Sequence, residues 1–402
     1  MVKYSTFKKN LKLGIERGDD NNLAFLTHYL QNHKNGVSQH YKEPAIKYYS
    51  ELNEQSNFVS EPAIQQLLPL DFDVPFPSPS KVDFTFIDLF AGIGGFRIPM
   101  QQLNGKCVFT SEFNYYAQIS YELNFGEVPF GDITKMDLNI VPEHDVLVAG
   151  FPCQPFSISG KMRGFEDTRG TLIYSVFQII EKRNPKVILL ENVKHLVHHD
   201  NGNTLKVIIQ HLEELGYIIS WKVLNASDFG IPQNRERIII IGSKKTKFDF
   251  AKIETQPKPT LKSFLEKDVE FEYLNEEYTL LNNYKIQESG LIFVGYRNKK
   301  IRGAGVRPGT EHLSRVHKQP NRIYSSEGIH PALPSQESSG RFWIYDEGKV
   351  RKLTINECYR LMGFPDDFIK IYNTSALYKQ IGNSVCIPMI QEVAKQIKKQ
   401  LL

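Results

Sequence analysis

From Lys81 onward, short apolar runs alternate with stretches of helical periodicity, and this alternation limits the possible folds more than any other feature. The apolar runs have the length of β-strands and cover residues 84–89, 106–111, 145–149, 187–191 and 237–241. Helical stretches lie between them, at residues 97–103, 117–124, 172–182 and 205–215. We therefore predict an α/β fold, a parallel sheet with helices on both faces. In such sheets, ligands bind beyond the carboxyl ends of the strands.

The chain divides into four predicted parts. Residues 1–80 form an N-terminal extension that ends in a proline-rich linker; we expect a separate unit, and a helix-turn-helix reader, a packing arm and a tether all remain open for it. Residues 81–262 carry the alternation. Residues 263–350 are rich in Gly, Arg, Ser and His, lose the alternation, and indicate a smaller irregular domain. Helical periodicity returns in residues 351–402.

Composition and cysteine usage argue against several classes of protein. The chain has 402 residues, 41% of them hydrophobic, which suffices for a sizeable core. Four scattered cysteines without a Cys-x-x-Cys pair argue against a zinc site or a disulfide framework and for a reducing cytoplasm. No apolar run reaches the roughly 18 residues of a membrane span, and no apolar signal segment is visible. We expect a cytoplasmic protein with no metal and no membrane contact.

A strand, a glycine turn and a helix meet at residues 84–97, and the turn contains Gly92 and Gly94. Glycines permit a sharp turn and the close approach of a ligand to the backbone. Glu112 follows at the end of the second strand, where a carboxylate can accept hydrogen bonds from ribose hydroxyls. Asp132 follows the next turn, where it can accept from an adenine amino group. Three ordinary turn residues are the alternative, but they do not explain this order along successive strands.

These residues favour S-adenosyl-L-methionine as the ligand over a dinucleotide. The glycine spacing is not the Gly-x-Gly-x-x-Gly of dinucleotide sites. Asp88 would also place a negative charge near a pyrophosphate. A carboxylate in that place suits a cationic sulfonium cofactor.

Cys153 follows the strand at residues 145–149 and stands between Pro152 and Pro155, which restrict the backbone. A lone cysteine is more often a buried structural residue, so the thiol by itself leaves structure and catalysis open. Glu191 ends a strongly apolar strand, where burial should raise its pKa. Arg235 and Arg237 flank the start of a further strand and are expected at the same sheet edge.

A thiol, an acid, arginines and a methyl donor suggest one reaction. A thiolate adds to C6 of a cytosine while an acid supports N3, which makes C5 nucleophilic enough to accept a methyl group. A base then removes the C5 proton and the thiol leaves. Cysteine suits this scheme because it adds to an unsaturated carbon and departs again.

In these motifs the chain resembles the C5-cytosine-specific DNA methyltransferases of the bacterial type II restriction–modification kind. The motifs that carry the resemblance are Asp88-Leu-Phe-Ala-Gly-Ile-Gly-Gly95, Gly150-Phe-Pro-Cys-Gln154, Glu191-Asn-Val193, Gln233-Asn-Arg-Glu-Arg237 and Gly382-Asn-Ser-Val385. The resemblance covers residues 84–242 and 351–385. It implies a Rossmann-like S-adenosylmethionine-dependent methyltransferase sheet, a target-recognition domain at residues 263–350, and a hinge and C-terminal helices at residues 351–402 that return to the catalytic domain.

The resemblance also implies residue roles. Cys153 would be the nucleophile and Glu191 the acid at N3. Arg237 would hold the base's O2 while Arg235 supports its loop. The residues implied to bind the cofactor are Phe90, Gly92, Gly94, Glu112, Phe113, Asp132, Ile133, Pro152, Leu172, Asn383, Ser384 and Val385. The catalytic loop corresponds to residues 154–169; its implied DNA contacts are Ser157, Ser159 and Lys161, with Ser159 entering the space that a flipped-out base vacates.

Residues 297–322 carry a cluster of basic side chains with one acid, Glu311. Arginine can address guanine with two hydrogen bonds, while lysines bind phosphates. A solvated basic loop is the alternative for any single side chain there. The candidate DNA-reading residues are Arg302, Arg307, Arg315, Gln319 and Arg322. By the resemblance, Gln319 would fill the hole left by the flipped base.

One departure from the family pattern affects the reading segment. Ala332 stands before Leu333 where the family usually has threonine, so a hydroxyl that would anchor phosphates is missing. We expect Ser335 or His330 to substitute for it.

We therefore expect a monomeric enzyme that methylates C5 of one cytosine in a short sequence of double-stranded DNA. It would protect that sequence from a restriction endonuclease without forming a stable complex with it. Two alternatives remain: an RNA cytosine-5 methyltransferase built on the same sheet, and a non-catalytic DNA-binding regulator that uses residues 1–80. The basic segment favours DNA, and Cys153, Glu191 and Arg237 argue against a protein that only binds.

Overall fold

The computed structural model describes residues 2–17, 21–33, 36–53, 70–152, 172–299, 313, 316–336, 342–371 and 373–402. In these ranges, no helix has both the length and the apolar composition needed to cross a membrane.

In the described ranges, the large sheet has six strands in the order β4-β3-β5-β6-β9-β7. Their bounds are β3 Phe84–Leu89, β4 Gly105–Ser111, β5 Val146–Gly150, β6 Val187–Val193, β7 Ile218–Asn225 and β9 Glu236–Ser243. All five predicted strands are confirmed. However, β9 pairs antiparallel with both β6 and β7, so the prediction of a wholly parallel sheet is wrong at this strand. Residues 226–235 between β7 and β9 are too short for the crossover of about a dozen residues that a parallel neighbour requires.

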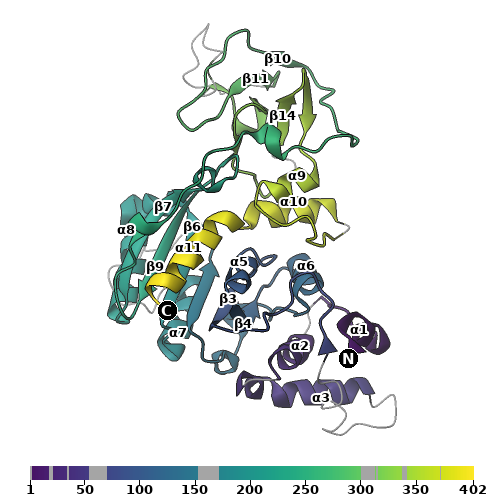
Figure 1. Ribbon diagram of the computed structural model, residues 1–402, viewed down its shortest axis with the longest axis vertical. Coiled ribbons are helices and arrows are strands. Elements are labelled where there is room, and N and C mark those ends of the chain that lie inside the picture. The colour runs from purple at the N-terminus through teal and green to yellow at the C-terminus, as the bar shows by residue number, and fades with distance from the viewer. Residues whose placement is uncertain are drawn as a thin grey trace.

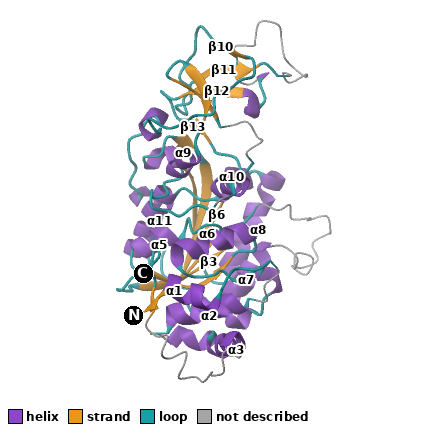
Figure 2. Ribbon diagram, turned by 90° about the vertical axis from the view of Figure 1, so that its right-hand side faces the viewer, coloured by secondary structure: helices purple, strands orange, loops and turns teal. Residues whose placement is uncertain are grey.

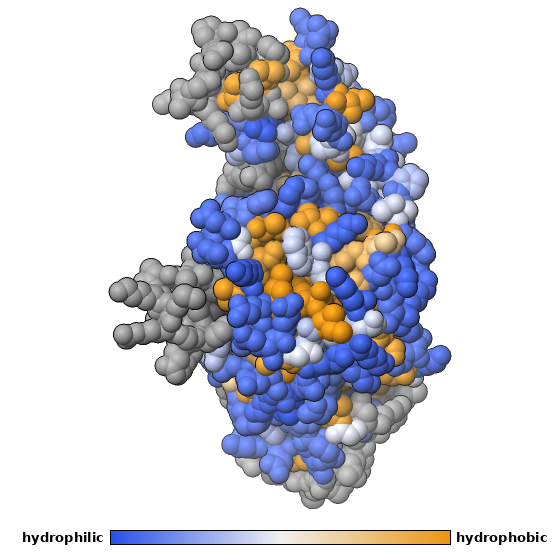
Figure 3. Space-filling model, turned by 90° about the vertical axis from the view of Figure 1, so that its left-hand side faces the viewer, coloured by the Kyte–Doolittle hydropathy of each residue, from blue (hydrophilic) through white to orange (hydrophobic). Residues whose placement is uncertain are grey.

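The edge strand β7 was not predicted, because its sequence has neither a continuous apolar run nor a clean alternation. Ile218 and Trp221 are 44% and 43% exposed, while Ser220 is buried. Figure 3 looks onto the side where β7 lies in Figure 1 and shows apolar residues gathered in the middle of that face, bordered by hydrophilic ones.

Helices cover both faces of the large sheet, as predicted. They are α5 Arg97–Gln102, α6 Tyr115–Phe125, α7 Leu172–Arg183, α8 Asn203–Glu214 and α11 Ile387–Gln400. Successive strand residues point to opposite faces: Val146 and Val148 of β5 pack in the cluster that contains α11, and Leu147 and Ala149 in the one that contains α7 and α8. Figure 2 shows α5 and α11 on one side of the strands and α7 and α8 on the other.

The N-terminal extension packs against the β4 edge of the sheet. Its elements are β1 Val2–Lys3, α1 Tyr4–Leu11, α2 Asn22–Asn32, α3 Lys42–Asn53 and β2 Leu70–Asp71, and β1 pairs with β2. Leu23 and Leu26 belong to the same hydrophobic cluster as Val108 of β4, and the buried Tyr41 hydroxyl donates to the Val108 carbonyl oxygen at 2.5 Å. The described part of the extension is therefore a packing arm that shares a core with the sheet, which differs from the separate unit expected from its sequence.

The described residues of the segment expected to be irregular contain a small sheet of five short strands, ordered β10-β11-β12-β14-β15. Their bounds are β10 Tyr278–Leu280, β11 Phe293–Arg297, β12 Arg322–Ser325, β14 Trp343–Asp346 and β15 Lys349–Lys352. Strands of three to five residues are too short to show a period in the sequence. Figure 1 shows this sheet at the end of the molecule opposite the N-terminal helices.

Two helices lie between the small and the large sheet, α9 Ile355–Arg360 and α10 Thr374–Asn383 (Figure 1). A buried ion pair joins the small sheet to α9, since Arg351 Nη2 of β15 lies 2.9 Å from Glu357 Oε1. A further link is the parallel pairing of β8 Gln233–Asn234 with β13 His330–Pro331. The small sheet is thus tied to the large one at its base, and Figure 3 shows the molecule hollowed on one side between the two parts.

Candidate active site

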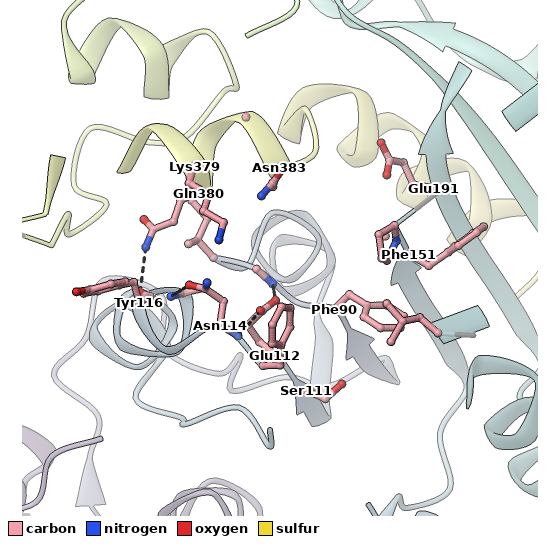
Figure 4. Close-up of a pocket in the computed structure, with 18 of the residues that line it drawn as sticks. Phe90, Ser111, Glu112, Asn114, Tyr116, Phe151, Glu191, Lys379, Gln380 and Asn383 are labelled. Atoms are coloured by element: carbon pink, nitrogen blue, oxygen red, sulfur yellow. Dashed lines mark hydrogen bonds between the residues drawn. The ribbon is translucent and has the colours of Figure 1, made fainter. Parts of the chain in front are cut away.

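A cavity of about 850 Å³ opens at the carboxyl ends of β3, β4, β5 and β6. This volume is in the range of small-molecule sites. The lining residues from the strand ends include Phe90, Ser111, Gly150 and Glu191, and those from α10 include Lys379, Gln380 and Asn383. Figure 4 shows Glu112 and Glu191 in different parts of this cavity, Glu112 below α10 and Glu191 to the right of it. The site therefore lies where the α/β fold predicts it.

The two glycines of the turn after β3, Gly92 and Gly94, have different functions. Gly92 has a φ of +57° and nothing within 4 Å of the place where a Cβ would be, so its backbone faces the cavity. Gly94 has a φ of +86°, and a Cβ there would lie 2.2 Å from the Phe125 ring. Gly94 is therefore required for packing against α6 and does not line the cavity, unlike the prediction.

Glu112 joins the glycine turn to the start of α6. Its Oε2 accepts from the Gly92 N–H at 2.8 Å and its Oε1 accepts from the Asn114 N–H at 2.7 Å (Figure 4). Burial raises the pKa of Glu112, and these two backbone donors oppose the rise. Each oxygen keeps a further lone pair for a hydroxyl group of a ligand.

The residues around Glu112 offer an apolar surface and further acceptors. Phe113 is 74% exposed, although it lines the cavity, so its ring is available to stack on a planar group. Asp132 lines the cavity with Ile133, and Asp132 Oδ1 accepts from the Thr134 N–H at 3.0 Å. Carboxylate acceptors beside an exposed aromatic ring fit a ligand of the nucleoside type. Among the described residues, no group of three His, Cys, Asp or Glu side chains could hold a metal ion.

At the other end of the cavity, Glu191 and Arg237 form a partly buried ion pair. Arg237 Nε lies 2.9 Å from Glu191 Oε1. Burial raises the pKa of Glu191, and the positive charges of Arg237 and Arg235 oppose the rise. The sequence prediction of a raised pKa at this position agrees in direction. Glu191 is thus a carboxyl group that can hold a proton and still reaches the cavity.

Arg235 also lines the cavity but is only 2% exposed, and its guanidinium bonds to the backbone of distant segments. Nη2 donates to the carbonyl oxygens of Gly382 and Ser384 at 2.9 and 2.6 Å, and Nη1 donates to that of Leu333 at 3.4 Å. Burial lowers the pKa of Arg235 to about 9, so the group remains cationic at neutral pH. Its role is to position other chain segments.

The predicted C-terminal contribution is split in the structure. Asn383 lines the cavity, whereas Ser384 and Val385 do not. A Cβ on Gly95 would lie 2.8 Å from both Ser384 Oγ and Val385 Cγ2, so these two side chains pack against the glycine turn. They hold the turn and α10 together and do not face the cavity.

The predicted reading residues that the structure describes lie in the small sheet. Gln319 is half-buried in the short helix before β12, and Arg322 Nε donates to the His317 carbonyl oxygen at 3.1 Å. Of the two substitutes expected for the hydroxyl missing at Ala332, His330 is 1% exposed, which is incompatible with a phosphate contact. Ser335 is half-buried and remains the candidate.

Several predicted residues lie outside the described ranges. They are Cys153, Ser157, Ser159, Lys161, Arg302, Arg307 and Arg315. The described residues on either side of positions 153–171 are Pro152 and Leu172, and both line the cavity.

Sequence reasoning missed part of the cavity wall, notably Asn114, Tyr116, Lys379 and Gln380. Gln380 Nε2 donates to the Tyr116 carbonyl oxygen at 2.9 Å and so joins α10 to α6 (Figure 4). The helical spacing could have indicated Lys379 and Gln380, because they stand four and three residues before Asn383 and share its face of α10.

Asp88 was expected to place a negative charge near the ligand, and the structure contradicts this. Asp88 is fully buried under the turn and does not line the cavity. Among the described residues, neither of its carboxyl oxygens has a hydrogen-bond partner. Burial raises the pKa of Asp88 to about 8, with Arg97 opposing the rise. Asp88 therefore offers little negative charge to a ligand at neutral pH.

Comparisons with known proteins agree with this geometry. The model of the family described as C-5 cytosine-specific DNA methylase matches residues 84–399. Type II methyltransferase M.HhaI from Haemophilus parahaemolyticus is 42% identical over 334 residues, which cover 79% of this chain and 94% of the relative. Type II methyltransferase M.HpaII from Haemophilus parainfluenzae is 41% identical over 361 residues, which cover 86% and 97%. Among solved structures, the S. pombe Dnmt2 methyltransferase matches with a TM-score of 0.56 at 16% identity, covering 79% of this chain and all of that one, which confirms the fold.

The buried Asp88 leads to a prediction about stability and pH. Its pKa in the folded state, about 8, is above the value of about 3.9 in an unfolded chain, so the folded protein holds a proton that the unfolded chain has lost. Stability should therefore fall as pH rises from about 4 to 8. We expect the free energy of unfolding to fall between pH 5 and 8 by at least about 1.4 kcal/mol less in Asp88→Asn than in the wild type, the equivalent of one pKa unit. Urea unfolding at both pH values measures this difference.

The control is Asp83→Asn, since Asp83 is a solvated carboxylate whose pKa is lowered by Lys398 and which therefore has the opposite linkage. A wild-type stability that is flat over this range, or equally steep in Asp88→Asn, contradicts the assignment.

Proposed function

Because this chain belongs to the family of C-5 cytosine-specific DNA methylases, and is thus an enzyme that methylates cytosine C5 in DNA, we propose that its cavity holds S-adenosyl-L-methionine beside Glu112 and a flipped-out cytosine beside Glu191. The observation that carries the proposal is that Glu112 and the Glu191–Arg237 pair line one cavity. The RNA alternative is not favoured, because the similar curated proteins are named as type II methyltransferases.

The cofactor's place follows from the chemistry of the wall. Glu112 would accept from the ribose hydroxyls, and Phe113 would stack on the adenine ring. Asp132 and Ile133 would border the adenine, while Asn383 closes the cavity from α10. S-adenosylmethionine supplies an electrophilic methyl group. The remaining predicted contacts that line the cavity are Phe90, Gly92, Pro152 and Leu172.

The chain's own residues would make the cytosine reactive. The Cys153 thiolate attacks C6 while Glu191 gives its proton to N3, so the electron pair of the C5–C6 bond becomes available at C5. Arg237, which pairs with Glu191, would donate to the base's O2. After C5 has accepted the methyl group, a base removes the C5 proton, the electrons of that bond restore the C5–C6 double bond and expel the thiolate, and N3 returns its proton to Glu191. Support for Cys153 comes from its motif and from Pro152, which lines the cavity.

The partners and boundaries are part of the same proposal. Residues 263–350 would read double-stranded DNA, with residues 81–262 and 351–402 as the catalytic part. Arg302, Arg307, Arg315, Gln319 and Arg322 are the candidate reading residues, and Ser157, Ser159 and Lys161 the candidates in the catalytic loop. The enzyme would act as a cytoplasmic monomer and protect its target sequence from a restriction endonuclease.

The nucleophile can be tested by trapping. Duplex DNA that carries 5-fluorocytosine at the target should form a stable adduct with the wild type, because fluorine blocks the removal of the C5 substituent. Cys153→Ser should abolish both turnover and the adduct and leave DNA binding intact, as measured by mass spectrometry and fluorescence anisotropy. Cys107, Cys358 and Cys386 are buried and cannot replace the thiol. Turnover by the serine variant, or an adduct at another residue, would overturn the mechanism.

The proton held by Glu191 gives a pH dependence. The single-turnover rate should fall on the alkaline side as Glu191 loses its proton, and burial moves this fall above the usual range of a glutamate. Arg237 lowers the pKa of Glu191. The Arg237→Met variant should therefore have a lower single-turnover rate, and the alkaline fall of that rate should occur at a higher pH than in the wild type. Lys194→Met is the matched control, because Lys194 pairs with Glu236. A fall that stays in place, or moves to lower pH, shows that Glu191 is not the acid.

Arg322 can be tested as a base-reading residue. Arg322→Ala should reduce the discrimination between the cognate site and altered sites by about 1–3 kcal/mol, with a smaller loss of binding to random DNA. The control is Arg297→Ala, an arginine of the same sheet that is paired with Glu276. Equal losses on cognate and random DNA would make Arg322 a phosphate contact.

A further inference from the structure

The N-terminal extension has no role in the proposed reaction, and residues 1–83 precede the part that the family model matches. Its helix α2 nevertheless lies along residues 125–131, the backbone that connects α6 to the cavity wall. Among the described residues, three side chains of the extension, those of Gln31, Thr27 and Asn21, bond to the backbone of this connection.

The three bonds follow one another toward the cavity. Gln31 Nε2 donates to the Phe125 carbonyl oxygen at 2.9 Å. Thr27 Oγ1 accepts from the Val128 N–H at 3.0 Å. Asn21 Oδ1 accepts from the Gly131 N–H at 2.8 Å. Gln31 and Thr27 are buried, so water does not readily replace these bonds.

The last of these bonds ends at the cavity itself. Gly131, Asp132 and Ile133 are consecutive residues of its wall. Asn21 is the residue before α2 and has a φ of +70°, a left-handed conformation that asparagine, aspartate and glycine tolerate. The left-handed backbone at position 21 therefore suits asparagine, whose short side chain can accept a hydrogen bond from the backbone of Gly131.

A second contact from the extension reaches another part of the wall. Arg17 Nη2 donates to the Tyr116 hydroxyl at 3.1 Å, and the guanidinium lies 5.1 Å from the Tyr115 ring and 5.6 Å from the Tyr116 ring. Tyr116 lines the cavity and is held from the other side by Gln380. The extension thus contacts the wall at two separate places.

We propose that Asn21 and Arg17 are positioning residues for the cofactor: they fix Gly131 and Tyr116, and with them the part of the wall expected to receive the adenosine moiety. This inference rests on the proposed assignment of the cavity to S-adenosylmethionine. The extension is then a functional part of the methyltransferase that sets its affinity for the cofactor, while cytosine and DNA are held by other residues.

The test measures the binding of S-adenosylhomocysteine to the full chain by titration calorimetry. Asn21→Gly removes the acceptor without straining the left-handed backbone, and it should weaken binding about three- to tenfold, the effect of losing one neutral hydrogen bond. Asn21→Asp keeps the acceptor and should restore the affinity. Arg17→Met should weaken binding in the same direction. In turnover assays, the KM for S-adenosylmethionine should rise while kcat and the Kd for DNA stay the same.

The matched control is Tyr41→Phe, which removes a bond between the extension and β4 away from the cavity and should leave the cofactor Kd unchanged. If the extension only adds stability, Tyr41→Phe and Asn21→Gly will act alike, and the proposal falls. It also falls if Asn21→Gly and Arg17→Met both bind as the wild type does. Should Asn21→Gly not fold, Arg17→Met alone decides in the same way.

A separate variant distinguishes failure of the underlying assignment. Glu112→Ala removes the carboxylate assigned to the ribose. If the wild type binds S-adenosylhomocysteine and Glu112→Ala binds it equally well, the cavity assignment is wrong, whatever the extension does.

Discussion

The buried guanidinium of Arg235 is the interaction on which the arrangement of the site depends. Its N–H groups donate to the carbonyl oxygens of Leu333, Gly382 and Ser384. Leu333 lies at the base of the small sheet, and Gly382 and Ser384 lie at the end of α10. A buried donor that loses its partner costs about 1–3 kcal/mol, and more when it is charged, so the loss of any of these carbonyl contacts would leave a donor of the buried guanidinium unpaired. These two segments and the start of β9 are therefore held as one unit, although up to about 150 residues separate them in the chain.

The spacing of the motif around Arg235 has a structural reason. Residues 233, 235 and 237 stand at alternate positions of this motif, and each has its own partner. Gln233 donates to the Leu361 carbonyl oxygen and accepts from the Leu333 N–H. Arg237 pairs with Glu191. Two residues of this row thus fix the base of the small sheet, and the third reaches the group proposed to carry the proton.

Much of the large sheet could be predicted because each of its central strands is a run of apolar residues that ends in a turn. The antiparallel direction of β9 could not be predicted, because it depends on the short connection from β7. The strand β7 itself lacks an apolar run and was not predicted. In the site, the positions of Glu112 and Glu191 at the cavity were predictable because strand ends converge, and that of Asp132 because it follows the next turn. The packing functions of Gly94, Ser384 and Val385 were not, since they depend on contacts with Phe125 and Gly95 from other parts of the fold.

Three buried carboxyl groups at this end of the sheet show how local partners divide their functions. Asp88 is fully buried and does not line the cavity, so its carboxyl group, whose pKa is raised, cannot contact a ligand there. Glu112 faces the cavity, but two backbone N–H groups favour its ionised form and suit it to accept hydrogen bonds. Glu191 faces the cavity with a pKa raised by burial, and the positive charges of Arg237, which pairs with it, and Arg235 oppose the rise. Burial alone would make all three alike; access to the cavity and the kind of donor present are what make Glu191 the candidate for proton transfer.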